Sequence, residues 1–179
     1  MKSKLKKSDF TEIYKMLDEV SPVPYDCGTL CGCACCMAEG SDYVMYLLPG
    51  EEKMFTGKED WLEWGKDRAE DYEFPESWHG YVYYIRCKNA PLCHRSKRPI
   101  QCRTYPLTPY IDEYGVLELI YNTGDYPYNC PLVDNYEKLD DDFIRATYEA
   151  WKKLLTDPYI YDLVELDSCG RDPKTIINP

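Results

Sequence analysis

The sequence predicts an α+β fold: a small, irregular single domain with short strands, a hairpin and a few helices, organised around a cysteine-rich metal centre. Helical and strand-like periodicities alternate along the chain, 13 prolines and 10 glycines indicate many loops, and five of the ten cysteines fall within ten residues. A chain of 179 residues can bury one core. We expect an N-terminal helix and linker over 1–25, a cysteine-cluster metal-binding core over 26–131 and a C-terminal helical segment of the same domain over 132–179.

The N-terminal third predicts a helix, a strand and a second helix. Ser8 is a suitable N-cap for a helix that runs to about Glu19, where apolar residues recur at helical spacing, and residues 21–24 end it with two prolines. Residues 43–48 are rich in aromatic and branched side chains, which predicts a strand. Residues 59–71 predict a helix with two tryptophans on one side.

The middle of the chain predicts a strand and then a hairpin. Residues 81–85 form the clearest strand pattern, and they lead directly to Arg86-Cys87. Four prolines predict that residues 88–109 are irregular. Residues 110–112 and 116–121 are joined by a short turn and predict the two arms of a hairpin.

The C-terminal part predicts a loop followed by one strong helix. Residues 129–131 lie in the expected loop. Residues 140–155 form an amphipathic pattern with acidic residues in the first turn and lysines near the end, as the helix dipole favours. The pattern beyond Tyr159 does not distinguish helix from loop.

The density of cysteines is the most informative local feature. Five lie between Cys27 and Cys36, and a second group lies between residues 87 and 102. Thiolates bind zinc and iron-sulfur clusters strongly, and thiolates close in sequence converge on one ion at little entropic cost. Gly28 and Gly32 each follow a cysteine, where a positive φ would curl the backbone round a metal.

Disulfides are the rival use of ten cysteines, so the expected compartment matters. The basic N-terminal residues are not followed by an apolar run, so we expect no secretory signal, and no stretch of about 18 apolar residues predicts a membrane span. We therefore expect a cytoplasmic protein whose thiols stay reduced. Cysteine makes up roughly 6% of the chain, below the roughly 8–10% typical of disulfide scaffolds.

Charge is unevenly distributed along the chain. The net charge of −11 argues against general nucleic-acid binding and against adsorption to anionic membranes. Residues 86–103 contain no acidic side chain and six basic ones, so this window is +6 and the remainder is −17: Arg86, Lys88, Arg95, Lys97, Arg98 and Arg103. Because cysteines share this window, its cations can lower thiol pKa values and offset the charge of a thiolate-metal centre. A solvated basic loop is the alternative.

The cysteine spacing follows a family pattern. The chain reads Cys27-x3-Cys31-x3-Cys35-Cys36, then Cys87-x5-Cys93-x8-Cys102 and Cys130, with Arg98-Pro-Ile-Gln-Cys102-Arg-Thr-Tyr-Pro-Leu107 around Cys102. Over about residues 26–131 this resembles the YkgJ-type cysteine-cluster family, a zinc- or iron-chelating domain with a C-x2-C-x2-C-C run and a later R-P-x-x-C-R-x-Y-P segment. The three-residue gaps in the first run are more similar to the flagellin lysine-N-methylase subgroup.

The resemblance implies which residues form the site. Eight cysteines correspond to candidate metal ligands: Cys27, Cys31, Cys35, Cys36, Cys87, Cys93, Cys102 and Cys130. Arg98 and Arg103 are the candidate cofactor-binding residues of the later motif. Eight thiolates suffice for two four-coordinate centres, and the adjacent Cys35 and Cys36 point in different directions, so we expect them to serve two centres or to bridge two metals. Cys33 and Cys169 have no counterpart, and His94 is an alternative ligand beside Cys93.

These observations predict a metal-binding protein whose cysteine thiolates chelate zinc or iron, with an iron-sulfur cluster as one form of the iron. Two alternatives remain open. One is an iron-sulfur redox or radical enzyme such as a protein lysine methylase, and the other is a structural zinc module for protein interaction. The expected partners are metal ions, with no membrane and no general nucleic-acid binding; the sequence identifies no protein partner.

Overall fold

Two three-stranded antiparallel sheets and a set of helices make up the fold, in a computed structural model that describes residues 2–37, 44–88, 90, 92–93, 95–124, 126–135, 138–171, 173, 176–177 and 179. The strand orders are β1-β3-β2 and β4-β5-β6. This architecture confirms the predicted small α+β domain. The strands are β1 (Met45–Tyr46), β2 (Leu62–Arg68), β3 (Tyr81–Cys87), β4 (Leu107–Ile111), β5 (Leu117–Tyr121) and β6 (Ile176–Ile177).

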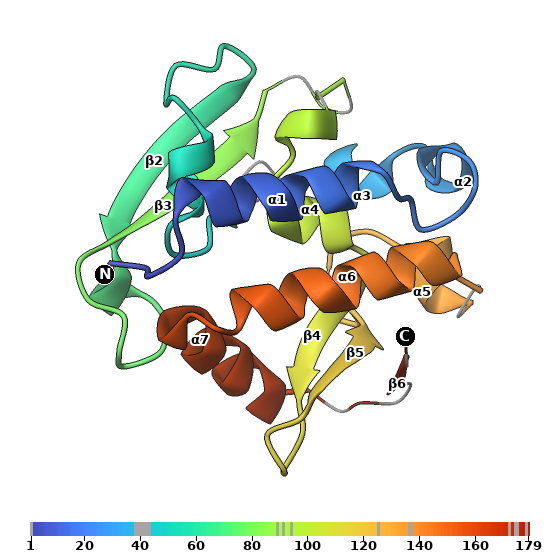
Figure 1. The fold of residues 1–179 in the computed structure, drawn as a ribbon. Coiled ribbons are helices and arrows are strands. Elements are labelled where there is room, and N and C mark those ends of the chain that lie inside the picture. Colours follow the sequence, from blue (N-terminus) through green and yellow to red (C-terminus); the bar gives the residue numbers. More distant parts are fainter. Residues whose placement is uncertain are drawn as a thin grey trace.

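Helices α1 and α6 lie side by side across the middle of the molecule, between the two sheets (Figure 1). The shorter helices α2 and α3 lie beyond one end of α1. The helices are α1 (Lys7–Asp18), α2 (Gly28–Cys31), α3 (Ala34–Met37), α4 (Ile100–Thr104), α5 (Pro131–Asp134), α6 (Asp141–Leu154) and α7 (Pro158–Cys169), with short 3₁₀ helices η1 (Glu51–Met54), η2 (Ala69–Asp71) and η3 (Arg95–Lys97).

One main core joins the three parts of the sequence. Phe10 from α1, Leu107 from β4 and Phe143 from α6 belong to the same buried cluster. A second, smaller cluster lies under the first sheet and contains Trp61 and Ile85. Burial of aromatic and branched side chains from both ends of the chain therefore stabilises the central segment that carries most of the cysteines.

The predicted N-terminal helix is confirmed, but α1 begins at Lys7, before the expected cap at Ser8. The first turn is closed by a carboxylate, because Asp9 Oδ2 accepts a hydrogen bond of 2.7 Å from the backbone N–H of Lys6. Asp9 thereby satisfies one of the backbone donors that a helix leaves unpaired at its N-terminus.

Asp140 caps the predicted C-terminal helix, α6. Its Oδ1 accepts hydrogen bonds from the backbone N–H groups of Asp142 at 2.9 Å and Phe143 at 3.3 Å. We expect Asp140→Ala to lower the free energy of unfolding by about 1 kcal/mol, because both donors lose their partner. Urea denaturation measures this, and Asp141→Ala, in the same turn but without the cap bonds, serves as the control. Equal losses in the two variants would contradict the capping role.

The predicted helix over residues 59–71 is wrong: most of that segment is strand β2, followed by η2. Every residue of β2 pairs with β3, from Leu62 opposite Cys87 to Arg68 opposite Tyr81. The ring of Tyr84 covers Gly65, where an added Cβ would lie 2.0 Å from the ring. Pairing with a strong neighbouring strand therefore overrides the helical spacing of the two tryptophans.

The proline-rich stretch 88–109 is more regular than predicted. Pro99 stands at the N-cap of α4, and β4 already begins at Leu107. Pro109 lies within β4, which is an edge strand and therefore tolerates the missing N–H. The predicted hairpin is confirmed as β4 and β5, and the ambiguous tail forms α7.

A buried carboxylate holds α1, η1 and α4 together. Glu51 is fully buried, and its Oε1 accepts hydrogen bonds of 2.7 Å from both Tyr14 Oη and the backbone N–H of Ile100. Its Oε2 accepts a bond of 3.1 Å from the backbone N–H of Leu48. Burial raises the pKa of Glu51, whereas the three donors lower it. Because α4 carries Cys102, this network fixes the position of one candidate ligand.

In the described part of the chain, no helix has the length and apolar character needed to cross a membrane.

Candidate metal centre

The first cysteine run forms two short helices joined by a tight turn. Gly32 adopts a φ of +63° and ends α2, as predicted for a backbone that curls back. Gly28 instead lies within α2, where the expected positive φ is not found. Gly28 leaves room for Cys33, because a Cβ at Gly28 would lie only 2.5 Å from the Sγ of Cys33.

Four of the predicted ligands line one small pocket between the first run and the start of α5. The pocket has a volume of about 30 Å³, and the cysteines in its wall are Cys27, Cys31, Cys35 and Cys130. We call these four the pocket cysteines. Tyr105 and Leu132 complete much of the wall. The fold thus joins three thiols of the N-terminal run to one that follows it by about a hundred residues.

Tyr105 connects the R-P-x-x-C-R-x-Y-P motif to this pocket. Its pKa is raised by burial and by a hydrogen bond between its side chain and Cys130. Its ring meets those of Tyr126 and Tyr128 edge-on, with centroids 6.4 Å and 6.2 Å apart. The sequence identifies Tyr105 as part of the motif but gives no sign that it lies in the site. Tyr105 belongs to the site because it lies beside Cys130, and this proximity cannot be deduced from the sequence alone.

Within the pocket group, negative charges disfavour free thiolates. Burial raises the pKa of Cys27, and Asp26, Cys130 and Cys31 raise it further. A bound cation would reverse this balance, because thiolate ligands are stabilised by the metal they coordinate.

Cys35 and Cys36 are electrostatically different although they are adjacent. A hydrogen bond between the two side chains, and next the nearby charge of Arg98, lower the pKa of Cys36 to about 6. The same bond and burial raise the pKa of Cys35. Cys35 lines the pocket and Cys36 does not. The two side chains are hydrogen-bonded to each other, and the expectation that they serve two centres or bridge two metals stays a prediction.

The charge of Arg98 acts on thiols of both cysteine groups: it lowers the pKa values of Cys27 and Cys33 as well as those of Cys36 and Cys102. Its Nε donates a hydrogen bond of 3.1 Å to Cys93 Sγ. Burial raises the pKa of Cys102 to about 12, and Cys36 and Cys93 add to that rise while Arg98 opposes it. We call Cys36, Cys93 and Cys102, the three thiols that act on the pKa of Arg98, the arginine-side cysteines.

Arg103 does not lie at the thiols, although it was predicted beside Arg98 as a cofactor-binding residue. It is buried in the main body of the fold, where Nη1 donates to Asp18 Oδ1 at 2.6 Å. The guanidinium carbon lies 4.1 Å from the centroid of the Tyr14 ring. The second motif arginine therefore stabilises the packing of α4 against α1.

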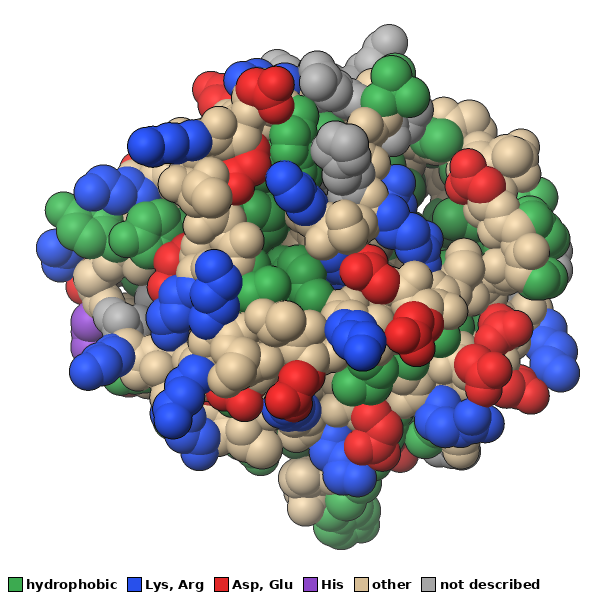
Figure 2. All heavy atoms as spheres, turned by 45° about the horizontal axis from the view of Figure 1, so that its top comes forward, with side chains coloured by type: hydrophobic (Ala, Val, Ile, Leu, Met, Phe, Trp, Pro, Cys, Tyr) green, Lys and Arg blue, Asp and Glu red, His purple; other side chains and the backbone are tan. Residues whose placement is uncertain are grey.

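The other cations of the basic window face different groups. Arg86 pairs with Glu63 at 3.8 Å, and Arg95 donates to the backbone oxygen of Val20. Lys97 is exposed. On the face shown in Figure 2, Lys and Arg side chains are interspersed with Asp and Glu side chains. Arg98 is thus the member of the predicted basic window whose charge acts on several described thiols.

One candidate ligand, Cys87, and the two cysteines without a counterpart in the family lie apart from these groups. Cys87 ends β3 and is exposed, opposite Leu62 of β2. Cys33 has a φ of +60° and lies over Gly28, outside the wall of the pocket. Cys169 is exposed at the end of α7, far from α2 and α3 (Figure 1). His94 lies outside the described residues.

Within the described ranges, no three histidine, cysteine or acidic side chains converge closely enough to hold a metal ion. The pocket thiols share one wall without forming a closed coordination sphere, so metal binding would require them to draw together. Their donor set nevertheless suits zinc or iron, since four cysteines are the ligand set of many tetrahedral sites.

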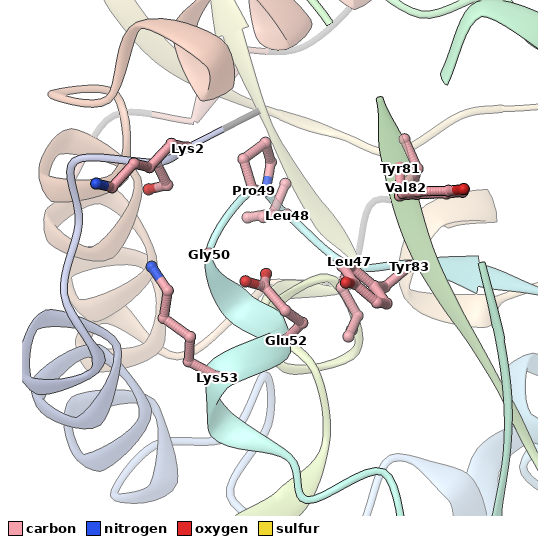
Figure 3. Close-up of a pocket in the computed structure, with 11 residues that line it drawn as sticks. Lys2, Leu47, Leu48, Pro49, Gly50, Glu52, Lys53, Tyr81, Val82 and Tyr83 are labelled. Atoms are coloured by element: carbon pink, nitrogen blue, oxygen red, sulfur yellow. The ribbon is translucent and has the colours of Figure 1, made fainter. Parts of the chain in front are cut away.

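A larger pocket of about 130 Å³ lies elsewhere, between the N-terminal segment, the start of η1 and β3 (Figure 3). Lys2, Lys53, Tyr81 and Tyr83 are among its lining residues, and none of the residues in its wall is a cysteine. This larger pocket is therefore not part of the candidate metal site.

Comparisons with protein-family models, with curated proteins and with solved structures gave no match to this chain.

Proposed function

We propose that this is a metal-binding protein in which cysteine thiolates chelate zinc or iron. The observation that carries the proposal is the pocket whose wall contains Cys27, Cys31, Cys35 and Cys130. Thiolates are strong ligands for both metals, and four of them match the coordination number of a closed structural site. We also propose membership of the YkgJ-type family, for which the R-P-x-x-C-R-x-Y-P segment is the support.

The size of the pocket favours an ion as its occupant. A volume of about 30 Å³ exceeds the roughly 10–15 Å³ that a cavity needs to hold one water molecule, so a single ion has room there. Pockets for organic cosubstrates are roughly ten times larger or more, about 300–1,000 Å³. The binding of one ion therefore fits this site better than the methylase alternative, which needs room for a cosubstrate beside the thiols.

The surroundings of the pocket also suit a bound cation. Asp26 contributes negative charge beside Cys27, and the Tyr105 side chain hydrogen-bonds Cys130. A hydroxyl that hydrogen-bonds a ligand sulfur orients it and tunes its basicity, as outer groups do around many metal ligands.

Metal content is the direct test of the proposal. We expect protein purified without oxygen to contain at least one zinc or iron per chain, measured by elemental analysis together with visible absorption and acid-labile sulfide. Brown protein with iron and sulfide would indicate a cluster, and colourless zinc-loaded protein would indicate zinc thiolates. Removal of the metal by a chelator should expose the pocket cysteines to alkylation. Protein without metal, in which all ten cysteines are oxidised to disulfides, would contradict the proposal.

The variant Cys130→Ser tests the pocket itself, because it removes one of its four thiols. We expect its metal content to fall by at least half relative to the unmodified chain, since a three-thiol site binds zinc more weakly. The matched control is Cys169→Ser, which changes an exposed thiol on α7 and should leave the metal content unchanged. Unchanged metal content in both variants would exclude the pocket as a binding site.

A further inference from the structure

The larger pocket, shown in Figure 3, has room for a small ligand that the metal proposal does not use. It lies between the N-terminal segment, residues 47–53 and β3, and its volume is about 130 Å³. A cavity of about 150 Å³ can hold benzene, so this pocket can admit a ligand of about six non-hydrogen atoms. Pockets for drug-sized ligands are larger, about 300–1,000 Å³. The size therefore restricts the occupant to a small molecule or ion.

Charged groups of both signs meet in the wall of this pocket. Lys2 and Lys53 lie on one side, and the Glu52 side chain lies between them and β3 (Figure 3). Glu52 and Lys53 are consecutive residues of η1, and a 3₁₀ helix has three residues per turn, so their side chains leave the helix about 120° apart. One short helix thus presents a carboxylate and an ammonium group to different parts of the same pocket.

These charges do not neutralise one another within the part of the chain that the structure describes. There, the Glu52 carboxylate accepts no hydrogen bond and forms no ion pair, and the same is true of the Lys2 ammonium group. Lys53 Nζ donates only to the backbone oxygen of Leu5, at 3.2 Å. A ligand with both charges can pair with both kinds of group, whereas a simple anion or a simple cation is repelled by one of them.

The β3 side of the pocket is aromatic. Tyr81 and Tyr83 line it, and they are 50% and 37% exposed. The face of a tyrosine ring attracts an ammonium group, and the ring of Tyr81 already does so outside the wall, where Lys66 Nζ lies 4.7 Å from its centroid. Together with Glu52, the two rings make this side suitable for a ligand ammonium group, while the lysines make the opposite side suitable for a carboxylate.

We propose that this pocket binds a small zwitterion, a free α-amino acid of about the size of alanine. Its ammonium group lies near Glu52 and the tyrosines, and its carboxylate lies near Lys2 and Lys53. The proposal is independent of the proposed metal-binding function, because none of the residues in this wall is a cysteine.

Titration of the unmodified chain with L-alanine, followed by amide NMR spectra, tests the proposal. We expect saturable shifts of the amide signals of Gly50 and Val82, which line the pocket. N-acetyl-L-alanine lacks the ammonium group and L-alaninamide lacks the carboxylate. Each should bind at least tenfold more weakly, the effect of losing one hydrogen bond between charged groups. Equal binding of either analogue, or no saturable shift at millimolar L-alanine, would overturn the proposal.

Two variants test the assigned groups. Glu52→Gln and Lys53→Gln remove one charge each with little change of size, and each should weaken L-alanine binding at least tenfold. The matched control is Lys66→Gln, which removes a positive charge beside Tyr81 but outside the wall, and its affinity should stay within about twofold. Equal losses in Lys53→Gln and Lys66→Gln would assign the binding to the general charge of this surface and overturn the proposal.

The amide spectra of each variant also verify its fold, and the comparison of the three ligands needs no variant at all. Metal content is measured on the same samples. Absence of alanine binding in metal-loaded protein would refute the amino-acid site and leave the proposed function intact, whereas alanine binding by protein without metal would support this site and contradict the proposed function.

Discussion

Replacing Glu51 with alanine should lower the free energy of unfolding by about 3 to 4 kcal/mol. The substitution removes a fully buried acceptor and leaves three donors without it: Tyr14 Oη and the backbone N–H groups of Leu48 and Ile100. A buried donor without a partner costs about 1–3 kcal/mol, and water entering the new cavity would recover part of that loss. Urea denaturation of the reduced protein measures the change.

The neighbouring residue provides the control for this prediction. Glu52 lies in the same short helix η1 but is only partly buried, so Glu52→Ala should change the stability by less than about 0.5 kcal/mol. A similar loss in both variants would mean that η1 as a whole, and not the Glu51 hydrogen bonds, determines the stability.

The burial of Glu51 is a feature that the sequence does not reveal. An acidic residue directly after Pro49-Gly50 has the pattern of a solvated turn, and composition gives no sign that it is buried. Two of its three donors come from positions 37 and 49 residues away along the chain, and the third is the nearby backbone N–H of Leu48. Only the packing of α1 and α4 against η1 brings the two distant donors to Glu51, so local patterns could not identify them.

The sequence predicts correctly the elements whose own residues carry all the signals for them. Helix α6 has an N-cap aspartate, acidic residues in its first turn and an apolar face, and all three signals agree. The sequence of β2 predicts a helix, which is wrong, because the contacts that make it a strand lie outside the segment: the pairing with β3 and the ring of Tyr84 over Gly65. Strand identity there is a tertiary property.

In the candidate site, too, some features can be predicted from the sequence and others depend on the fold. The resemblance to the cysteine-cluster family selects the eight cysteines and the motif around Cys102. Spacing could not show that Cys130 joins the first run, because the approach of α5 to α2 depends on the whole fold. It also could not separate Arg98 from Arg103. Arg103 follows Cys102 on α4, and consecutive residues of a helix point about 100° apart, so its side chain turns toward α1.

The final prediction uses that difference between the arginines. Arg98→Gln should weaken the zinc binding proposed for this chain about 10- to 100-fold, the usual effect of removing a group that hydrogen-bonds a metal ligand. The variant loses the N–H donor to Cys93 Sγ and the positive charge that favours thiolates at Cys36 and Cys102. Competition with a chromophoric zinc chelator measures the affinity, and circular dichroism verifies the fold.

Lys97→Gln is the matched control, because it removes one positive charge from the adjacent, exposed position in the same basic window. We expect its zinc affinity to stay within about twofold of the unmodified chain, since exposed charges are screened by solvent and salt. An equal loss in both variants would mean that the general charge of the window, and not the hydrogen bond from Arg98, supports the metal. A selective loss in Arg98→Gln would show that the arginine acts through its contact with the thiols, as its position beside Cys93 indicates.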